Sequence, residues 1–488
     1  MTDTITSGKA ELGMIGLGVM GRNLLLNLAD HGFRVAGYDR SAAQVAALAE
    51  EGRGQAILAA TDLTGLVAGL KIPRTVMLLV PAGAAVDAVI HELVAWLEPG
   101  DLIIDAGNSH FKDTETRAKA LAIRGIHFLG VGISGGESGA RHGPSLMPGG
   151  DREVYERVRP MLEAVAAKVK GEPCVTWLGP GAVGHYVKMV HNGIEYAVMQ
   201  LLAESYDLMK RGYGLTDDEL GAAYRGWNAG ELNGYLMEIT GNIFERPDGA
   251  DGGRLIDAIM GVARQNGTGM WTSQSAMELQ VPTPTIDVAV AMRNVSLLTA
   301  ERELAGVIYR QPEHVFNFKR DLLLEQVGRA LFAGILVSYA QGMALLSVAS
   351  KYYGYGLNLG AVARIWRGGC IIRSALLDNI AEAYATNPEL GNILLAPNLS
   401  QQLADHLEGL RQTIWQAAAA GVPVPGLMVS LGYFDAYRSA WLPDNLIQAQ
   451  RDYFGAHTYE RIEGPGSFHT DWEKTAVEMA PIEKVTTV

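Results

Sequence analysis

The chain has 488 residues, of which 48% are hydrophobic and 19% are charged. This length suggests about three domains at a rough ~150 residues each, and the composition is typical of a globular protein and argues against disorder. The formal net charge of −13 argues against a nucleic-acid partner, because such proteins usually carry a basic surface, but an anionic substrate can still be held by local basic residues.

The N-terminal segment, Met1 to Lys9, is short and polar and lacks the apolar core of a signal peptide. No stretch reaches ~18 uninterrupted apolar residues, so we expect no membrane span. The two cysteines, Cys174 and Cys370, match no metal-binding spacing and are expected to be buried thiols in a reducing compartment. These features predict a cytoplasmic protein without a metal site.

Strand-like and helix-like patterns alternate over the first third of the chain. The strand candidates are residues 12–15, 34–38, 75–80, 102–104, 126–129 and 175–178, and the helix candidates are 23–29 and 44–50. Strands that alternate with helices imply crossover connections and a parallel sheet. We therefore predict an α/β Rossmann-type dinucleotide-binding domain over residues 1–181.

The middle of the chain, residues 182–440, places its apolar residues mostly at helical spacings. Residues 186–211 form one long helix candidate that ends at Gly212, a plausible C-cap, and residues 322–349 form another. This segment predicts a large all-α domain.

A C-terminal tail, residues 441–488, begins after Trp441-Leu442 and changes composition again. About 45 residues are too few to build a hydrophobic core of their own. The tail must therefore pack on its own chain or on a partner subunit.

The run Gly16-Leu17-Gly18-Val19-Met20-Gly21 has the G-x-G-x-x-G spacing of a dinucleotide site. It follows one strand, opens a helix and precedes a second strand that ends at Asp39, which is the context that the motif requires. The glycines permit a tight turn, close approach of the pyrophosphate and close helix packing, and the helix N-terminus offers free N–H groups. Asp39 is placed to bond the adenosine ribose, while Arg40 could stack on adenine or meet a 2′-phosphate. The alternative is an ordinary glycine-rich turn.

Four polar residues, Lys188, His191, Asn192 and Glu195, recur at i, i+3, i+4 and i+7 and so share one face of a helix whose other residues are largely apolar. A buried polar stripe needs partners, which a bound substrate could supply. Lys188 would be a base if its environment lowered its pKa, and Glu195 an acid if its pKa were raised. The alternative is a solvated face, although two turns separate the Lys and the Glu.

Long segments resemble the signature of 6-phosphogluconate dehydrogenases. The matching segments are Gly184 to Tyr196, Gly107-Asn108-Ser109, Ser134 to Glu137, Gly143 to Gly150, Trp366 to Ser374 and Gln448 to Glu460. The resemblance covers nearly the whole chain.

The resemblance implies oxidative decarboxylation of 6-phospho-D-gluconate to D-ribulose 5-phosphate and CO₂ with NAD(P)⁺, as in the pentose phosphate pathway. Lys188 would take the proton of the C3 hydroxyl as hydride leaves C3, and would then stabilise the enediol oxygen. Glu195 would protonate C1.

The resemblance also implies a set of binding residues. The carboxylate and hydroxyls of the substrate would be held by Asn108, Ser134, Gly135, Gly136, His191 and Asn192, and its phosphate by Tyr196, Thr268 and Arg293, with Asn266 at a further phosphate-binding position. The substrate would also be reached by Arg451 and His457 from the tail of the other subunit of a homodimer. The cofactor would be held by Gly16, Leu17, Gly18, Val19, Met20, Gly21, Asp39, Arg40, Ser41, Val80, Pro81, Ala82 and Asn108.

The chain departs from the family pattern at informative positions. Most tail-bearing members use NADP and have Asn-Arg-Thr after the second strand, whereas this chain has Asp39-Arg40-Ser41, and Pro81 replaces a usual Lys. A carboxylate suits ribose hydroxyls and repels a 2′-phosphate, so we expect NAD to be favoured although NADP is the family default. Asn266 stands where the family has a phosphate-contacting Lys, which predicts weaker phosphate binding.

Two other functions compete with this interpretation. A related β-hydroxyacid dehydrogenase would share the first domain and a catalytic lysine, but such enzymes are shorter and lack the tail. A dinucleotide-binding regulator without turnover would have no need to keep Lys188 and Glu195 together.

Overall fold

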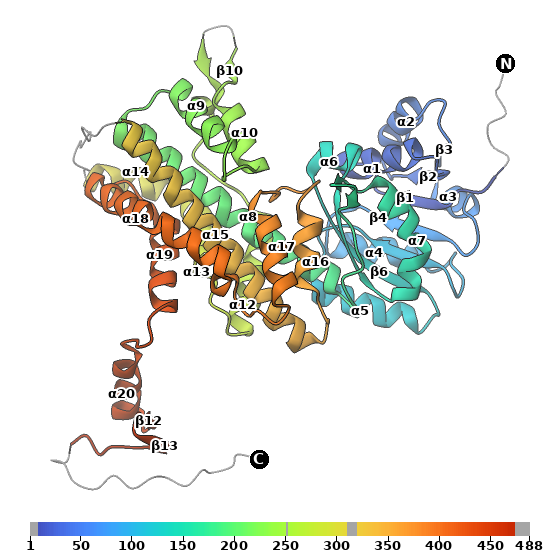
Figure 1. Ribbon diagram of the computed structural model, residues 1–488. Coiled ribbons are helices and arrows are strands. Elements are labelled where there is room, and N and C mark those ends of the chain that lie inside the picture. The colour runs from blue at the N-terminus through green and yellow to red at the C-terminus, as the bar shows by residue number, and fades with distance from the viewer. Residues whose placement is uncertain (1–7, 250–251, 310–319, 474–488) are drawn as a thin grey trace. The chain divides into compact units, whose positions relative to one another are not determined.

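The computed structural model describes residues 8–249, 252–309 and 320–473. Its internal contacts divide the chain into two units, Met1–Leu431 and Gly432–Val488. The first unit joins a sheet flanked by helices to a group of long helices, and the second consists of a helix and a hairpin (Figure 1).

The sheet of the first unit has seven strands in the order β3-β2-β1-β4-β5-β6-β7. The strands are β1 (Leu12–Ile15), β2 (Val35–Tyr38), β3 (Ile57–Ala59), β4 (Thr75–Leu78), β5 (Leu102–Asp105), β6 (His127–Ser134) and β7 (Ser145–Gly150). Strands β1 to β6 pair in parallel, as expected for an α/β domain. Strand β7 is antiparallel to β6, so the expectation of a wholly parallel sheet was wrong at this edge.

The strand expected at 175–178 was also wrong, since Val175 forms a single isolated bridge with Leu146 of β7. Bonds run from Leu146 N to Cys174 O and from Leu178 N to Pro148 O. In a parallel ladder the residue between these bonds, Pro148, would donate next, but proline has no N–H. The ladder is therefore interrupted.

Helices cover both faces of the sheet. One face packs against α1 (Val19–Asp30), α2 (Ala42–Glu51), α6 (Gly136–His142) and α7 (Arg152–Val165). The other face packs against α3 (Leu63–Ala68), α4 (Ala84–Leu93) and α5 (Phe111–Ala122). The predicted Rossmann-type architecture is confirmed.

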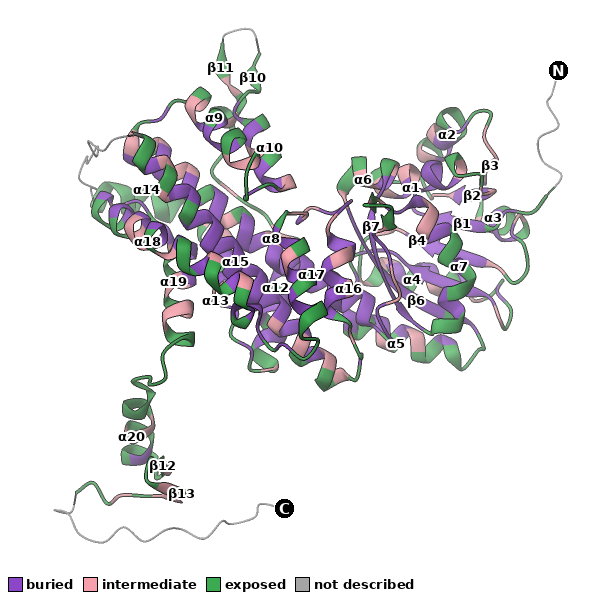
Figure 2. Ribbon diagram, in the orientation of Figure 1, coloured by how far each residue is buried: buried purple, intermediate pink, exposed green. Residues whose placement is uncertain are grey.

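The rest of the unit is mainly helical. After the small β8–β9 hairpin (Lys168–Val169 and Glu172–Pro173) come α8 (Val183–Asp207), α9 (Asp217–Asn228), α10 (Tyr235–Ile243), the β10–β11 hairpin (Pro247–Asp248 and Gly253–Arg254), α11 (Leu255–Ala258), α12 (Thr268–Glu278), α13 (Pro284–Ser296), α14 (Thr299–Ile308), α15 (Arg320–Tyr353), α16 (Leu359–Trp366), α17 (Leu376–Thr386), a 3₁₀ turn (Ile393–Leu395), α18 (Pro397–Ala420) and α19 (Pro425–Tyr437). Helices α8 and α15 pack together and are buried along most of their length (Figure 2).

The end of α8 differs from the expectation. A π-helical turn, Leu208–Gly212, follows α8, and Gly212 belongs to this turn instead of capping the helix. The residue in the left-handed region is Gly214, with φ of 68°, and its N–H donates to the carbonyl of Lys210. Glycine adopts this conformation without a Cβ penalty, so the chain reverses two residues later than predicted.

Helix α15 is long and apolar enough, from Asp321 to Tyr353, to cross a membrane by length and composition alone. However, 83% of its most apolar stretch is buried inside the unit. It therefore has the environment of a core helix.

The second unit contains α20 (Asp444–Gly455), β12 (Tyr459–Arg461) and β13 (Gly464–Phe468). Among residues 432–473, Asp452 alone is buried. Its carboxylate accepts hydrogen bonds from Thr458 N, Thr470 N, His469 Nδ1 and Trp472 Nε1 at 2.9–3.0 Å. Hydrogen bonds to one buried carboxylate, and not an apolar core, thus hold residues 432–473 together.

Candidate functional site

The turn between β1 and α1 has the geometry of a dinucleotide-binding loop. Gly16 has φ of 98°, and a Cβ there would lie 2.4 Å from Leu79 O, while a Cβ at Gly21 would lie 1.9 Å from Gly16 O. At Gly18, by contrast, an added Cβ meets nothing within 4 Å. Glycine is therefore required by the protein itself at two positions, and the third leaves open space for a ligand.

The N-terminus of α1 has neither a side-chain cap nor an acidic residue in its first turn. Its N–H groups and the helix dipole are available to an anion such as a pyrophosphate. Val19 of the motif is exposed, whereas Leu17 is buried in the core and contributes its backbone. These residues fit a dinucleotide.

Asp39, at the end of β2, is held by two backbone donors. Leu17 N donates to its Oδ2 at 2.7 Å and Ser41 N to its Oδ1 at 2.8 Å. Each carboxylate oxygen has a further lone pair, so the group can still accept bonds from ribose hydroxyls.

A hollow of about 200 Å³ lies beside Asp39. Its walls include the apolar residues Tyr38, Leu63, Val80 and Pro81 and the charged residues Arg40 and Glu92. Arg40 pairs with Glu92 across 2.6 Å between Nη2 and Oε1. The shape suits an adenosine, and Glu92 is a lining residue that the sequence did not reveal because it lies 52 positions from its partner.

Lys188 is positioned by close contact between α8 and β6. A Cβ at Gly132 of β6 would lie 2.4 Å from Lys188 Cβ, and a Cβ at Gly184 would lie 2.3 Å from Gly130 O. The missing side chains let the helix backbone approach the sheet. Lys188 is consequently buried, with 6% of its surface exposed.

A continuous line of hydrogen bonds joins four of the predicted substrate residues. Ser134 Oγ contacts His191 Nε2 at 3.1 Å, His191 Nδ1 contacts Asn192 Oδ1 at 3.1 Å, and Asn192 Nδ2 donates to Thr268 Oγ1 at 3.0 Å. All four residues are buried. The structure therefore brings together side chains from β6, α8 and α12 that are up to 134 positions apart.

The predicted acid and base have shifted pKa values in the useful directions. Burial lowers the pKa of Lys188, and the carboxylate of Glu195 opposes this shift. Burial raises the pKa of Glu195, against the influence of Lys188 and Arg293. Burial, followed by the charge of Lys188, lowers the pKa of His191 well below its usual value. His191 therefore acts as a neutral hydrogen-bonding group, and Glu195 Oε2 lies 3.8 Å from its Nδ1.

Glu195 extends toward the predicted phosphate residues. The guanidinium of Arg293, on α13, stacks 3.5 Å above the ring of Tyr196, and Gly269 leaves room for that ring, since a Cβ there would lie 2.4 Å from it. Asn266 is exposed in the loop before α12.

The remaining predicted residues of the first unit lie at ends of strands. Asn108 is exposed after β5, and Gly135 and Gly136 follow β6. A Cβ at Gly135 would lie 2.5 Å from Gly369 O, whereas Gly136 has open space around it. The carboxyl ends of parallel strands are where α/β sheets bind their ligands.

Arg451 and His457 belong to the second unit and are both exposed. Arg451 Nη1 donates to Gln448 Oε1 at 2.9 Å on the same helix. His457 lies in the loop between α20 and β12, next to Thr458, whose N–H is held by Asp452. Asp452 is a second residue that the sequence analysis missed, because nothing in its spacing indicates that a carboxylate is buried.

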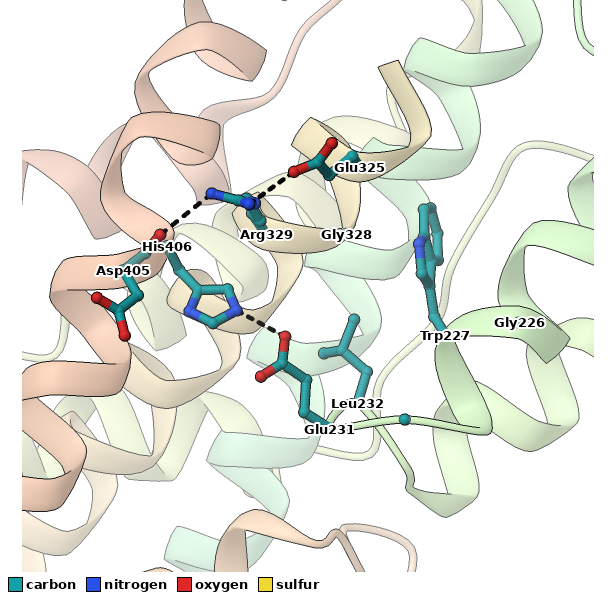
Figure 3. A pocket seen from close by; sticks show the side chains of 10 residues that line it. Gly226, Trp227, Glu231, Leu232, Glu325, Gly328, Arg329, Asp405 and His406 are labelled. Carbon is teal, nitrogen blue, oxygen red and sulfur yellow. Dashed lines mark hydrogen bonds and ion pairs between the residues drawn. The ribbon is translucent and has the colours of Figure 1, made fainter. Parts of the chain in front are cut away.

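A larger hollow of about 550 Å³ lies among α9, α15 and α18 (Figure 3). Four of its charged or titratable side chains form two pairs, as His406 contacts Glu231 at 2.7 Å and Arg329 contacts Glu325 at 2.6 Å. None of the predicted site residues lines it. We do not assign a function to it.

Potential metal ligands and thiols do not cluster. Over residues 8–249, 252–309 and 320–473, no group of three or more His, Cys, Asp or Glu side chains could hold a metal ion. Cys174 and Cys370 are buried and unpaired, as expected.

Comparison with known proteins covers both parts of the chain. The family description "NAD binding domain of 6-phosphogluconate dehydrogenase" matches residues 11–179, and "6-phosphogluconate dehydrogenase, C-terminal domain" matches residues 184–472.

Relatives align over nearly their whole length. The NADP(+)-dependent, decarboxylating 6-phosphogluconate dehydrogenase of Bacillus subtilis is 49% identical over 96% of this chain and 100% of its own. The decarboxylating enzyme of Escherichia coli is 46% identical over 95% of this chain and 99% of its own. The structure of Plasmodium falciparum 6-phosphogluconate dehydrogenase, studied in its apo form and with NADP⁺ and 6-phosphogluconate, has a TM-score of 0.92 at 40% identity and covers 95% of this chain and 100% of its own. This chain belongs to the 6-phosphogluconate dehydrogenase family.

Proposed function

We propose that the chain oxidises and decarboxylates 6-phospho-D-gluconate to D-ribulose 5-phosphate and CO₂ while it reduces NAD(P)⁺, as in the pentose phosphate pathway. The observation that carries this proposal is that Lys188 and Glu195 of α8 are largely buried and interact electrostatically, beside a line of hydrogen-bonded side chains that includes His191. The dinucleotide supplies the hydride acceptor when it is bound.

Lys188 is the general base in this proposal. Its lowered pKa increases the neutral fraction that can take the proton of the C3 hydroxyl. Once protonated, the ammonium stabilises negative charge on the C3 oxygen while CO₂ leaves, and the buried environment strengthens this interaction.

Glu195 is the general acid that protonates C1. Its raised pKa increases the fraction that carries a proton near neutral pH. Ser134, His191 and Asn192 orient the sugar acid, while Tyr196, Thr268 and Arg293 bind the phosphate.

The direct test measures CO₂ release and nicotinamide reduction with 6-phosphogluconate. The proposal requires one CO₂ for each reduced nicotinamide. Reduction without CO₂ would favour the related β-hydroxyacid dehydrogenases, and dinucleotide binding without either product would favour a regulator.

We infer that the enzyme is a homodimer whose tail completes the partner's active site. The second unit exposes Trp441, Tyr453 and Phe454 by 64%, 62% and 73%, and its described residues, 432–473, bury no apolar side chain. In the first unit, α14 has no buried residue and exposes Leu304 and Val307 by 61% and 70%. Large exposed apolar surfaces of this kind are typical of protein interfaces.

Complementation tests the shared site. Lys188→Ala and Arg451→Ala chains are each expected to be inactive, and a mixed dimer holds one site with both native residues. Mixing should therefore restore part of the activity. Mixed dimers that form but remain inactive would show that the tail acts within its own chain.

We infer that NAD is favoured over NADP, because Asp39 and Pro81 line the hollow beside Arg40 and the Asp39 carboxylate repels a 2′-phosphate. The ratio of kcat/KM for the two cofactors measures this preference, and a strong preference for NADP would contradict it. The cytoplasm supplies both the substrate and the reducing conditions that suit two free thiols, and we infer that it is the location of the enzyme.

A further inference from the structure

The hollow beside Asp39 is lined by the carboxylate of Glu92, whose position on its helix does not stabilise that helix. Glu92 lies in the last turn of α4, where the negative end of the helix dipole disfavours an acidic side chain. It nevertheless lines the hollow and contacts Arg40 Nη2 at 2.6 Å. The contact therefore connects Glu92 to ligand recognition more directly than to helix stability.

The charges around the hollow do not suit a phosphate. Its charged lining residues are Asp39, Arg40 and Glu92, so two carboxylates surround one guanidinium and the local net charge is negative. A free 2′-hydroxyl can donate to a carboxylate, whereas a 2′-phosphate adds negative charge and needs Arg40 as its partner.

The Arg40–Glu92 pair is exposed, with 65% and 49% of the two side chains accessible. Exposed ion pairs contribute little to stability because water screens them. Glu92 therefore does not prevent Arg40 from binding a competing anion. It competes with the 2′-phosphate for the guanidinium and repels that phosphate at the same time.

We propose that Glu92 is a specificity-determining residue that selects a dinucleotide with a free 2′-hydroxyl by engaging Arg40 and keeping the hollow negative. The inference rests on the proposed nicotinamide-dependent function and identifies a residue of its cofactor site. Arg40, the residue best suited to bind the 2′-phosphate of NADP, is thus present but paired with Glu92.

The test compares Glu92→Gln with the wild type by calorimetric titration of two probes, 2′,5′-ADP and 5′-ADP. Removal of one charge near a doubly charged phosphate should tighten 2′,5′-ADP on the order of tenfold at low salt, and 5′-ADP should change little. The gain should shrink at high salt, because exposed charges are screened. Glu92→Lys should give a larger gain.

Two further variants separate the causes. Glu50→Gln removes an equal charge from an exposed ion pair with Arg53 outside the hollow and should leave both affinities unchanged. When Arg40 is already replaced by Ala, the change Glu92→Gln should give a smaller gain in 2′,5′-ADP affinity, because only the direct repulsion of the phosphate is then removed. Unchanged 2′,5′-ADP affinity in Glu92→Gln, or a full gain without Arg40, would overturn the proposal.

Turnover provides the second measurement. The ratio of kcat/KM for NADP over NAD should rise in Glu92→Gln by the factor seen in binding. If neither cofactor supports turnover of 6-phosphogluconate in the wild type, the proposed function fails, while the two titrations still decide the role of Glu92.

Discussion

Replacement of Lys188 by Met should remove activity and stabilise the free protein. Methionine retains much of the length of the lysine side chain, so the packing against Gly132 is preserved while the charge is lost. Lys188 has 6% of its surface exposed, and no hydrogen bond contributes to its pKa, which burial lowers. The substitution therefore removes a poorly compensated buried charge.

The stability change follows from the lowered pKa. The folded pKa of Lys188 lies below the ordinary value of 10.5, so the unfolded chain binds the proton more tightly. The cost to folding is complete below the folded pKa and disappears as the pH rises to about 10.5. An unsatisfied buried polar group costs roughly 1–3 kcal/mol, which corresponds to a rise in Tm of roughly 1–3 °C for a protein of this size.

The assay is thermal unfolding at pH 7 and pH 9.5, together with turnover of 6-phosphogluconate. Turnover should fall by at least about 10²–10⁴-fold, and the gain in Tm should be smaller at pH 9.5. Lys119→Met replaces an exposed lysine on α5 and should change neither property. Near-full turnover in Lys188→Met would refute the assignment of the base, and a lower Tm would refute the argument from buried charge.

Five further substitutions test other parts of the chain. Glu195→Gln should reduce steady-state turnover by about 10²–10⁴-fold yet allow hydride transfer, and a single-turnover absorbance trace that lacks reduced nicotinamide would contradict this. Asn266→Lys should lower KM for 6-phosphogluconate by the equivalent of about 1–3 kcal/mol. Equal kcat/KM of the wild type for gluconate and 6-phosphogluconate would contradict the assignment of a phosphate site. Gly18→Ala should keep the wild-type Tm and lose dinucleotide affinity, whereas Gly21→Ala should lose stability as well, because its Cβ would strike backbone 1.9 Å away. Burial alone would raise the pKa of Asp452, but hydrogen bonds to its carboxylate lower it to about 2; its contribution is therefore present above the unfolded pKa of ~4 and lost toward pH 2, and Asp452→Asn should make the tail more sensitive to proteolysis at pH 7.

Local chemistry explains what could be predicted from the sequence. The glycine spacing from Gly16 to Gly21 specifies a turn that only small residues can form, and the position of Asp39 follows from the length of one βαβ connection. The polar stripe from Lys188 to Glu195 needs only the helical period to place its members on one face. The architecture, and the placement of Lys188 and Glu195 on one face of a helix, were therefore accessible without coordinates.

Tertiary structure decided the features that depend on long-range pairing. Strand β7 pairs antiparallel with β6, and Pro148 interrupts the ladder that the following segment would form with β7. The pKa shifts of Lys188 and Glu195 arise from burial between elements, which the helical pattern alone does not measure.

The same holds for charges that meet across the fold. Arg40 was visible as a candidate for the 2′-phosphate, but its pairing with Glu92 depends on how α4 packs beside β2. Asp452 could be counted as one acidic residue among many, and its four donors come from the loop before β12 and the segment that follows β13. The sequence alone thus determined which chemical groups this protein carries and where the helical and strand periods place them locally. The tertiary structure determined which of those groups are desolvated and which are paired, because desolvation and pairing depend on neighbours distant in the chain.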